Sequence, residues 1–191
     1  RNTYQLSLDA NGGTNGNYTT PIKIIYQDQY SLDNYIPTRT GYTFKGWYTA
    51  ASGGTRITGI NTWNYTSNKT FYAQWEQIKF SIDTNPMING TIYYSGKSGF
   101  KYNVYINGSL QKQNVEDYWA EVPYGGTLKL VPNSVAGYTA TEFSKTIYDN
   151  NAVTGPTWSL ANYTLNFNAN GGKTNTTSVT VTYTSSNYWD I

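Results

Sequence analysis

Two aromatic stretches decide the fold of the N-terminal part of the chain: Gly41-Tyr-Thr-Phe-Lys-Gly-Trp-Tyr48 and, downstream, Thr70-Phe-Tyr-Ala-Gln-Trp75. In both, large apolar side chains alternate with polar ones, which is the period of a strand with one buried face. Gly46 interrupts the alternation and indicates a bulge or a close backbone approach. Both stretches therefore predict strands of a small sheet. The side chains that we expect them to place in its core are Phe44, Trp47, Phe71 and Trp75.

A β-hairpin is predicted ahead of these strands. Leu6 and Leu8 alternate with polar neighbours, and residues 11–13, Asn-Gly-Gly, readily accept the positive φ of a tight turn. A second β-branched run, residues 22–26, supplies the partner strand, and Ile24 is its predicted core residue.

A short helix is expected between the hairpin and the aromatic strands, over residues 29–36. Tyr30, Leu32 and Ile36 would lie on one side of this helix, with a serine as its N-cap and a proline at its end. The order β-β-α-β-β is that of a small α+β domain whose helix crosses one face of the sheet.

The chain also contains an internal repeat. Residues 4–13 (YQLSLDANGG) match residues 163–172 (YTLNFNANGG) almost position for position, and a β-branched run follows each. The second copy stops before the aromatic strands, so we expect residues 162–191 to form only the first hairpin of another repeat. Its open edges would permit strand exchange between molecules. The incomplete copy further suggests that the sequence is a fragment of a larger protein.

Residues 78–161 predict a separate β-rich domain, because strand-like segments recur roughly every 8–12 residues, as in a sandwich or an elaborated grasp-like domain. This segment is dense in aromatic side chains, some of which should face solvent. Exposed rings suit stacking on a sugar or anchoring a protein contact, although Tyr is also a common strand residue that needs no ligand. The candidate binding residues are Tyr93, Tyr94, Tyr118, Trp119 and Tyr124.

Composition excludes several kinds of site. The 191 residues include no His and no Cys, which removes His-dependent triads, imidazole metal sites, disulfides and thiol nucleophiles. A net charge of +2 is too small for the basic surface that binds nucleic acid. No apolar run is long enough to span a membrane. Glu116, Asp117 and Glu121 form the acidic cluster that comes closest to a pair of catalytic carboxylates. Their position near one predicted strand is explained better by a solvated strand edge than by the carboxylate pair of a glycosidase. We expect no enzyme, no cofactor and no metal site.

The first unit resembles the Listeria–Bacteroides repeat, the internalin B-type B-repeat of bacterial surface proteins. The resemblance covers residues 3–77, and the first half of the repeat again at 162–191. The residues that carry it are Leu8-Asp-Ala-Asn-Gly-Gly13, Pro37, Gly41–Tyr48, Gly53-Gly-Thr55 and Phe71-Tyr-Ala-Gln-Trp75.

This resemblance implies a β-grasp (ubiquitin-like) fold, tandem arrays on secreted wall-attached proteins, and no catalytic residues. The domains expected are thus a repeat at 1–77, a β-rich domain at 78–161 and a partial repeat at 162–191. The function expected is that of a structural and adhesive segment of an extracellular surface protein, a spacer that also contacts a host or neighbouring-cell protein or glycan. The alternative is a carbohydrate-binding module of a secreted glycan-active protein.

Overall fold

The structure is a computed structural model that describes residues 1–151 and 153–183. Every element in these ranges is a strand, and none of the described residues belongs to a helix that could cross a bilayer. The mainly β class is therefore confirmed, and the helical part of the prediction is wrong. The chain divides into two units, Arg1–Ile78 and Lys79–Ile191.

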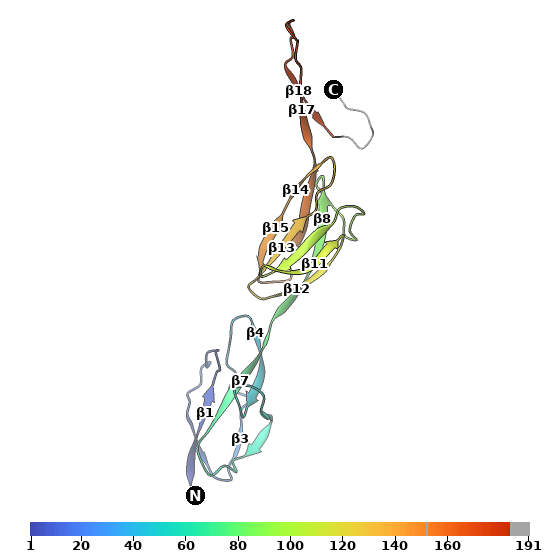
Figure 1. The fold of residues 1–191 in the computed structure, drawn as a ribbon. Coiled ribbons are helices and arrows are strands. Elements are labelled where there is room, and N and C mark those ends of the chain that lie inside the picture. The colour runs from blue at the N-terminus through green and yellow to red at the C-terminus, as the bar shows by residue number, and fades with distance from the viewer. Residues whose placement is uncertain (152, 184–191) are drawn as a thin grey trace. The chain divides into compact units, whose positions relative to one another are not determined.

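The first unit is built on one mixed five-stranded sheet, with the strand order β2-β1-β7-β4-β5 (Figure 1). Its strands are β1 (Thr3–Asp9), β2 (Ile22–Ile25), β4 (Tyr42–Tyr48), β5 (Arg56–Ile57) and β7 (Lys69–Gln77). The first and last strands lie side by side, because β1 pairs with β7 in parallel. The predicted hairpin is β1–β2, and β4 runs antiparallel to β7 on its other side.

The core of this unit is largely aromatic. Leu6, Leu8, Ile24, Trp47 and Phe71 are buried, whereas Phe44 and Trp75 are half-buried and pack against the same cluster. Trp63, which the sequence pattern did not single out, is the largest fully buried side chain of the unit. Its ring contacts Tyr4, Tyr30 and Tyr65.

The predicted helix over residues 29–36 is replaced by a short strand and a turn. Strand β3 (Gln29–Ser31) pairs with β6 (Ile60–Thr62), which turns the Tyr30 ring onto Trp63 and Phe71. Ser31 does not begin a helix: its hydroxyl accepts from the N–H of Asp33 and donates to the Asp33 carboxylate. A helix of eight residues is too short to offset its nucleation cost, so strand pairing and ring packing prevail.

The bulge predicted at Gly46 is confirmed. The register of β4 against β7 shifts between Phe44 and Gly46, and Gly46 has a φ of 132°. A Cβ at this position would lie 2.6 Å from Nε of Arg56. The glycine thus allows both the backbone conformation and the close approach of β5.

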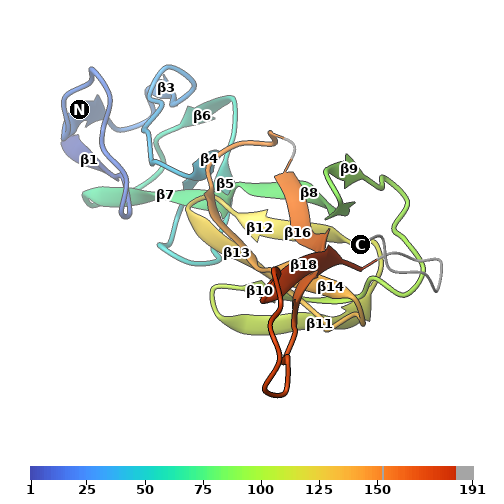
Figure 2. The same ribbon diagram turned by 90° about the horizontal axis from the view of Figure 1, so that it is seen from above.

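The second unit contains two sheets (Figure 2). Side chains from both sheets form one core, as in a β-sandwich. One sheet has the order β11-β10-β13-β15, and the other β12-β8-β16-β14, with β9 paired to β8. Their strands are β8 (Lys79–Ile88), β9 (Thr91–Ile92), β10 (Tyr102–Ile106), β11 (Ser109–Val115), β12 (Trp119–Pro123), β13 (Gly126–Pro132), β14 (Tyr138–Thr141), β15 (Phe143–Ile147) and β16 (Val153–Leu160).

Two large side chains organise this core. Trp158 is fully buried, contacts the Phe100 ring edge-to-face, and donates its indole N–H to the carbonyl oxygen of Asn133 at 3.1 Å. Tyr102 is also fully buried, and its hydroxyl lies 2.9 Å from Oγ1 of Thr84 and donates to the Thr84 carbonyl oxygen. Each polar tip therefore has a partner inside the core.

A two-stranded ribbon, β17 (Asn162–Asn166) and β18 (Ser178–Thr182), completes the described structure. Its base contacts the preceding sheet: the Tyr183 ring packs on Tyr138, and the N–H of Ala161 donates to the carbonyl oxygen of Gly137. The predicted partial repeat at 162–191 includes residues 184–191, which lie outside the described residues.

Replacing Trp158 with Ala should destabilise the second unit by about 3–5 kcal/mol, because it removes a fully buried ring and leaves a cavity. Trp119→Ala is the matched control in the same unit, since its side chain is 59% exposed, and it should change stability by less than about 0.5 kcal/mol. Urea unfolding followed by circular dichroism measures both. Equal losses for the two variants would contradict this account of the core.

Candidate functional site

The structure separates the five aromatic residues predicted to bind a ligand. Tyr93 and Tyr118 are half-buried and pack against the core of the second unit. Tyr124 contacts the rings of Phe80 and Tyr148. Tyr94 and Trp119 are left as exposed rings, at 71% and 59%.

Trp119 has polar neighbours on the outer face of its sheet. It stands directly opposite Asp83 across the β12–β8 pair, and Glu121 stands opposite Ser81. One Asp83 carboxylate oxygen accepts from the side-chain amide of Asn85 at 2.8 Å. The indole thus provides an exposed apolar ring beside carboxylates, a combination that suits a sugar.

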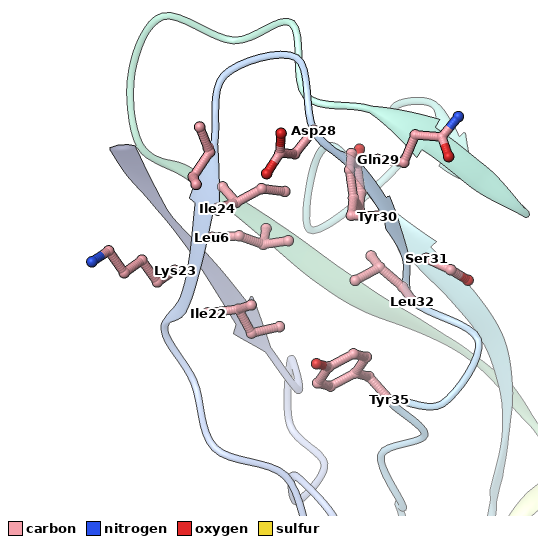
Figure 3. A pocket seen from close by; sticks show the side chains of 11 residues that line it. Leu6, Ile22, Lys23, Ile24, Asp28, Gln29, Tyr30, Ser31, Leu32 and Tyr35 are labelled. Atoms are coloured by element: carbon pink, nitrogen blue, oxygen red, sulfur yellow. The ribbon is translucent and has the colours of Figure 1, made fainter. Parts of the chain in front are cut away.

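A second candidate is a slot in the first unit, between β2 and the segment that follows it (Figure 3). Its volume is about 490 Å³. The apolar residues that line it are Leu6, Ile22, Ile24, Ile25, Tyr30, Leu32 and Tyr35. Figure 3 shows Ile22 and Ile24 directed toward Leu32 and Tyr35, while Lys23 points to the other side of the strand.

The strand beside this slot is the edge of its sheet. Within the described part of the chain, strand β2 pairs with β1 alone, so part of its backbone N–H and C=O groups face away from the sheet. Some proteins bind an extended peptide by adding it to such an edge and taking alternate side chains into adjacent pockets. The slot and the strand edge together provide both features of that binding mode.

Burial controls the ionisation of two tyrosines near the slot. Desolvation raises the pKa of Tyr18 to about 12, and desolvation, followed by the proximity of Tyr65, raises the pKa of Tyr30 to about 12. The Tyr18 hydroxyl donates to Oδ1 of Asn15 at 3.0 Å, and its ring meets those of Tyr35 and Trp47 edge-on. At neutral pH the hydroxyl groups of both tyrosines are therefore uncharged.

Two of the acidic residues considered in the sequence lie in different surroundings. Oε1 of Glu116 accepts from the N–H of Gly99 at 3.0 Å, and Glu121 faces solvent on β12. Within residues 1–151 and 153–183, no three acidic, His or Cys side chains come close enough to hold a metal ion.

The sequence prediction missed the slot. Its signal was present in the alternation of Ile22 and Ile24 around Lys23, but the residues opposite, Tyr30 and Leu32, were assigned to a helix. Because the segment is instead extended, Tyr30 and Leu32 point toward the sheet and form the other wall.

Comparison with known proteins identifies the first unit. The Listeria-Bacteroides repeat domain family matches residues 4–74. Residues 4–74 are a Listeria–Bacteroides repeat. No curated protein and no solved structure gives a significant match to the chain. Both the slot and the open edge of β2 therefore lie within the Listeria–Bacteroides repeat.

Stability should fall as pH rises from 10 to 12, because Tyr18, Tyr30 and Tyr102 stay neutral in the fold up to about pH 12 but ionise near pH 10 once unfolded. Their contribution is complete below pH 10 and is lost through this window. Tyr30→Phe should reduce the loss, whereas Tyr94→Phe, at an exposed ring, serves as the control. Urea unfolding at pH 9 and pH 11.5 provides the comparison, and equal pH dependence in both variants would contradict the assignment.

Proposed function

We propose that the chain is a structural and adhesive segment of a bacterial cell-surface protein. Listeria–Bacteroides repeats occur in bacterial surface proteins, and this is the basis for proposing an extracellular or wall location. In this proposal the chain has no catalytic role. Its first unit acts as a β-grasp variant in which the β3–β6 ribbon occupies the place of the helix, as the central parallel pair β1–β7 suggests.

The apolar slot beside the open edge of β2 is the observation that supports an adhesive role. An extended segment of a host or neighbouring-cell protein would add to this edge and insert one apolar side chain between Ile22 and Leu32. One such contact is weak. Several copies displayed on one cell would raise the effective affinity through avidity.

Beads coated with the chain should attach to epithelial or bacterial cells, and Ile22→Lys should reduce attachment about tenfold or more because it places a charge in the slot. Ile60→Lys is the matched control, since Ile60 is exposed on β6 of the same unit. Circular dichroism establishes that both variants remain folded. Attachment that is unchanged by Ile22→Lys would refute binding through the slot, and the absence of attachment by the parent chain would leave the spacer role alone.

The alternative function is carbohydrate binding, and the exposed Trp119 beside Asp83 and Glu121 favours it. In affinity electrophoresis through gels containing bacterial or plant polysaccharides, the parent chain would be retarded and Trp119→Ala would not. Tyr148→Ala, which also removes an exposed ring, is the control. Equal migration of the parent and Trp119→Ala in every gel would exclude this alternative.

A further inference from the structure

The register of β1 against β2 determines which backbone groups of β2 are free. The N–H of Tyr26 donates to the carbonyl oxygen of Asn2 at 3.0 Å, so this pair occupies a hydrogen-bonded position of the antiparallel ladder. Hydrogen-bonded and non-hydrogen-bonded pairs alternate along such a ladder, and Ile24 and Ile22 therefore also direct their N–H and C=O groups into the sheet. The backbone groups of Lys23, which lies between them, face away from β1.

Within β2, all of which the structure describes, Lys23 is the one residue that offers both a free donor and a free acceptor at this edge. The carbonyl oxygen of Ile25 already accepts from the N–H of Asp28 at 3.0 Å. Pro21, which comes directly before the strand, has no N–H to donate. The proline and the turn thus limit this edge to a short partner strand centred on Lys23.

The side chains of β2 define what such a partner would meet on each face. Ile22 and Ile24 point into the slot, whereas Lys23 points to the other side of the strand (Figure 3). The Lys23 side chain is exposed, and no carboxylate of the described residues lies within ion-pair distance of it. A residue paired with Lys23 would place its side chain beside this ammonium group, and the two residues flanking it would place theirs in the slot, toward Leu32 and Tyr35.

We propose that the slot binds a short extended segment in which one acidic residue stands between two apolar residues, paired antiparallel to β2. This proposal rests on the proposed function, because it specifies the partner of the same site. The acidic residue donates its N–H to the carbonyl oxygen of Lys23 and accepts from the N–H of Lys23. Antiparallel pairing takes both bonds from this one residue, whereas parallel pairing would take them from its two neighbours.

The charge of Lys23 distinguishes this occupant from a second copy of β2. Two β2 strands paired about Lys23 would bring two ammonium groups opposite each other, and like charges in directly opposed positions are destabilising. An Asp or Glu in a foreign segment replaces this repulsion with attraction. Strand β2 and both walls of the slot lie within residues 4–74, the range that the repeat family matches, so the site is contained in one repeat.

The test measures the binding of blocked peptides to the full chain through its amide chemical shifts. Thr-Val-Glu-Val-Thr should shift the amide of Lys23 and bind about fourfold more tightly than Thr-Val-Lys-Val-Thr, the preference expected of a cross-strand charge pair. Lys23→Glu should reverse this preference, and its exposed position leaves the core unchanged. Lys45→Glu, at an exposed lysine of β4 in the same unit, is the matched control and should leave the preference as it is.

Methylation of single peptide nitrogens tests the direction of the bound strand. A methyl group on the glutamate nitrogen removes the bond to the carbonyl oxygen of Lys23 and should weaken binding about tenfold or more. A methyl group on the nitrogen of the second valine should have a much smaller effect, because that N–H faces away from β2 in an antiparallel pair. The reverse result would show parallel pairing and would overturn the proposal.

The remaining outcomes separate this proposal from the adhesive function on which it rests. Cell attachment that depends on Ile22, together with equal binding of the glutamate and lysine peptides, would overturn the acidic partner and leave adhesion through the slot. A preference that Lys23→Glu does not reverse, or the absence of binding by both peptides, would likewise overturn it. Peptide binding with the expected preference, together with cell attachment that Ile22→Lys does not change, would support the partner chemistry and refute the adhesive role.

Discussion

The parallel pairing of β1 with β7 holds the first unit together. It joins residues near the start of the repeat, such as Leu6, to Lys69 near its end, and it places Leu8 beside Phe71 in the centre of the sheet. Strand β4 pairs with the other side of β7. The β3–β6 ribbon covers the apolar face of the sheet, where the rings of Tyr30 and Trp63 contact each other. Without this strand pair, the five-stranded sheet would separate into the β1–β2 hairpin and the three strands β7, β4 and β5.

Side chains of the same pattern are buried in one hairpin and partly exposed in the other, because the elements packed around the two hairpins differ. Leu6 and Leu165 occupy equivalent positions of equivalent hairpins, yet Leu6 is 1% exposed and Leu165 is 41% exposed. Local sequence thus specifies strand, turn and register, while burial is conferred by residues far away in the chain. In a chain without Cys, these packing contacts rather than disulfides must hold each unit together.

The sequence predicted well the features that depend on near neighbours. The hairpin turns, the bulge at Gly46 and the aromatic core strands follow from alternation and from glycine chemistry, and the structure contains each of them. The prediction of a helix over 29–36 was wrong because the spacing of Tyr30 and Leu32 fits one face of a helix as well as an extended segment. The contacts of the Tyr30 ring with Trp63 and Phe71, which are distant in sequence, favour the extended segment. Trp63 was missed for a related reason, since it lies outside regular strands and is buried by Tyr4, Tyr30 and Tyr65. Of the predicted surface aromatics, Trp119 and Tyr94 face solvent, whereas Tyr93 and Tyr118 pack on the core, a distinction that strand periodicity alone does not provide.

The separation in sequence between β1 and β7 also affects how the first unit forms. A contact between Leu8 and Phe71 closes a loop of about sixty residues, and such non-local pairing makes folding slow compared with that of a local helical bundle. During synthesis the N-terminal hairpin emerges from the ribosome first and resembles β17–β18 until residue 77 is available. For that interval its leucines are open to chaperones and to other nascent chains, so the rate at which the last strand emerges limits the time available for misassembly.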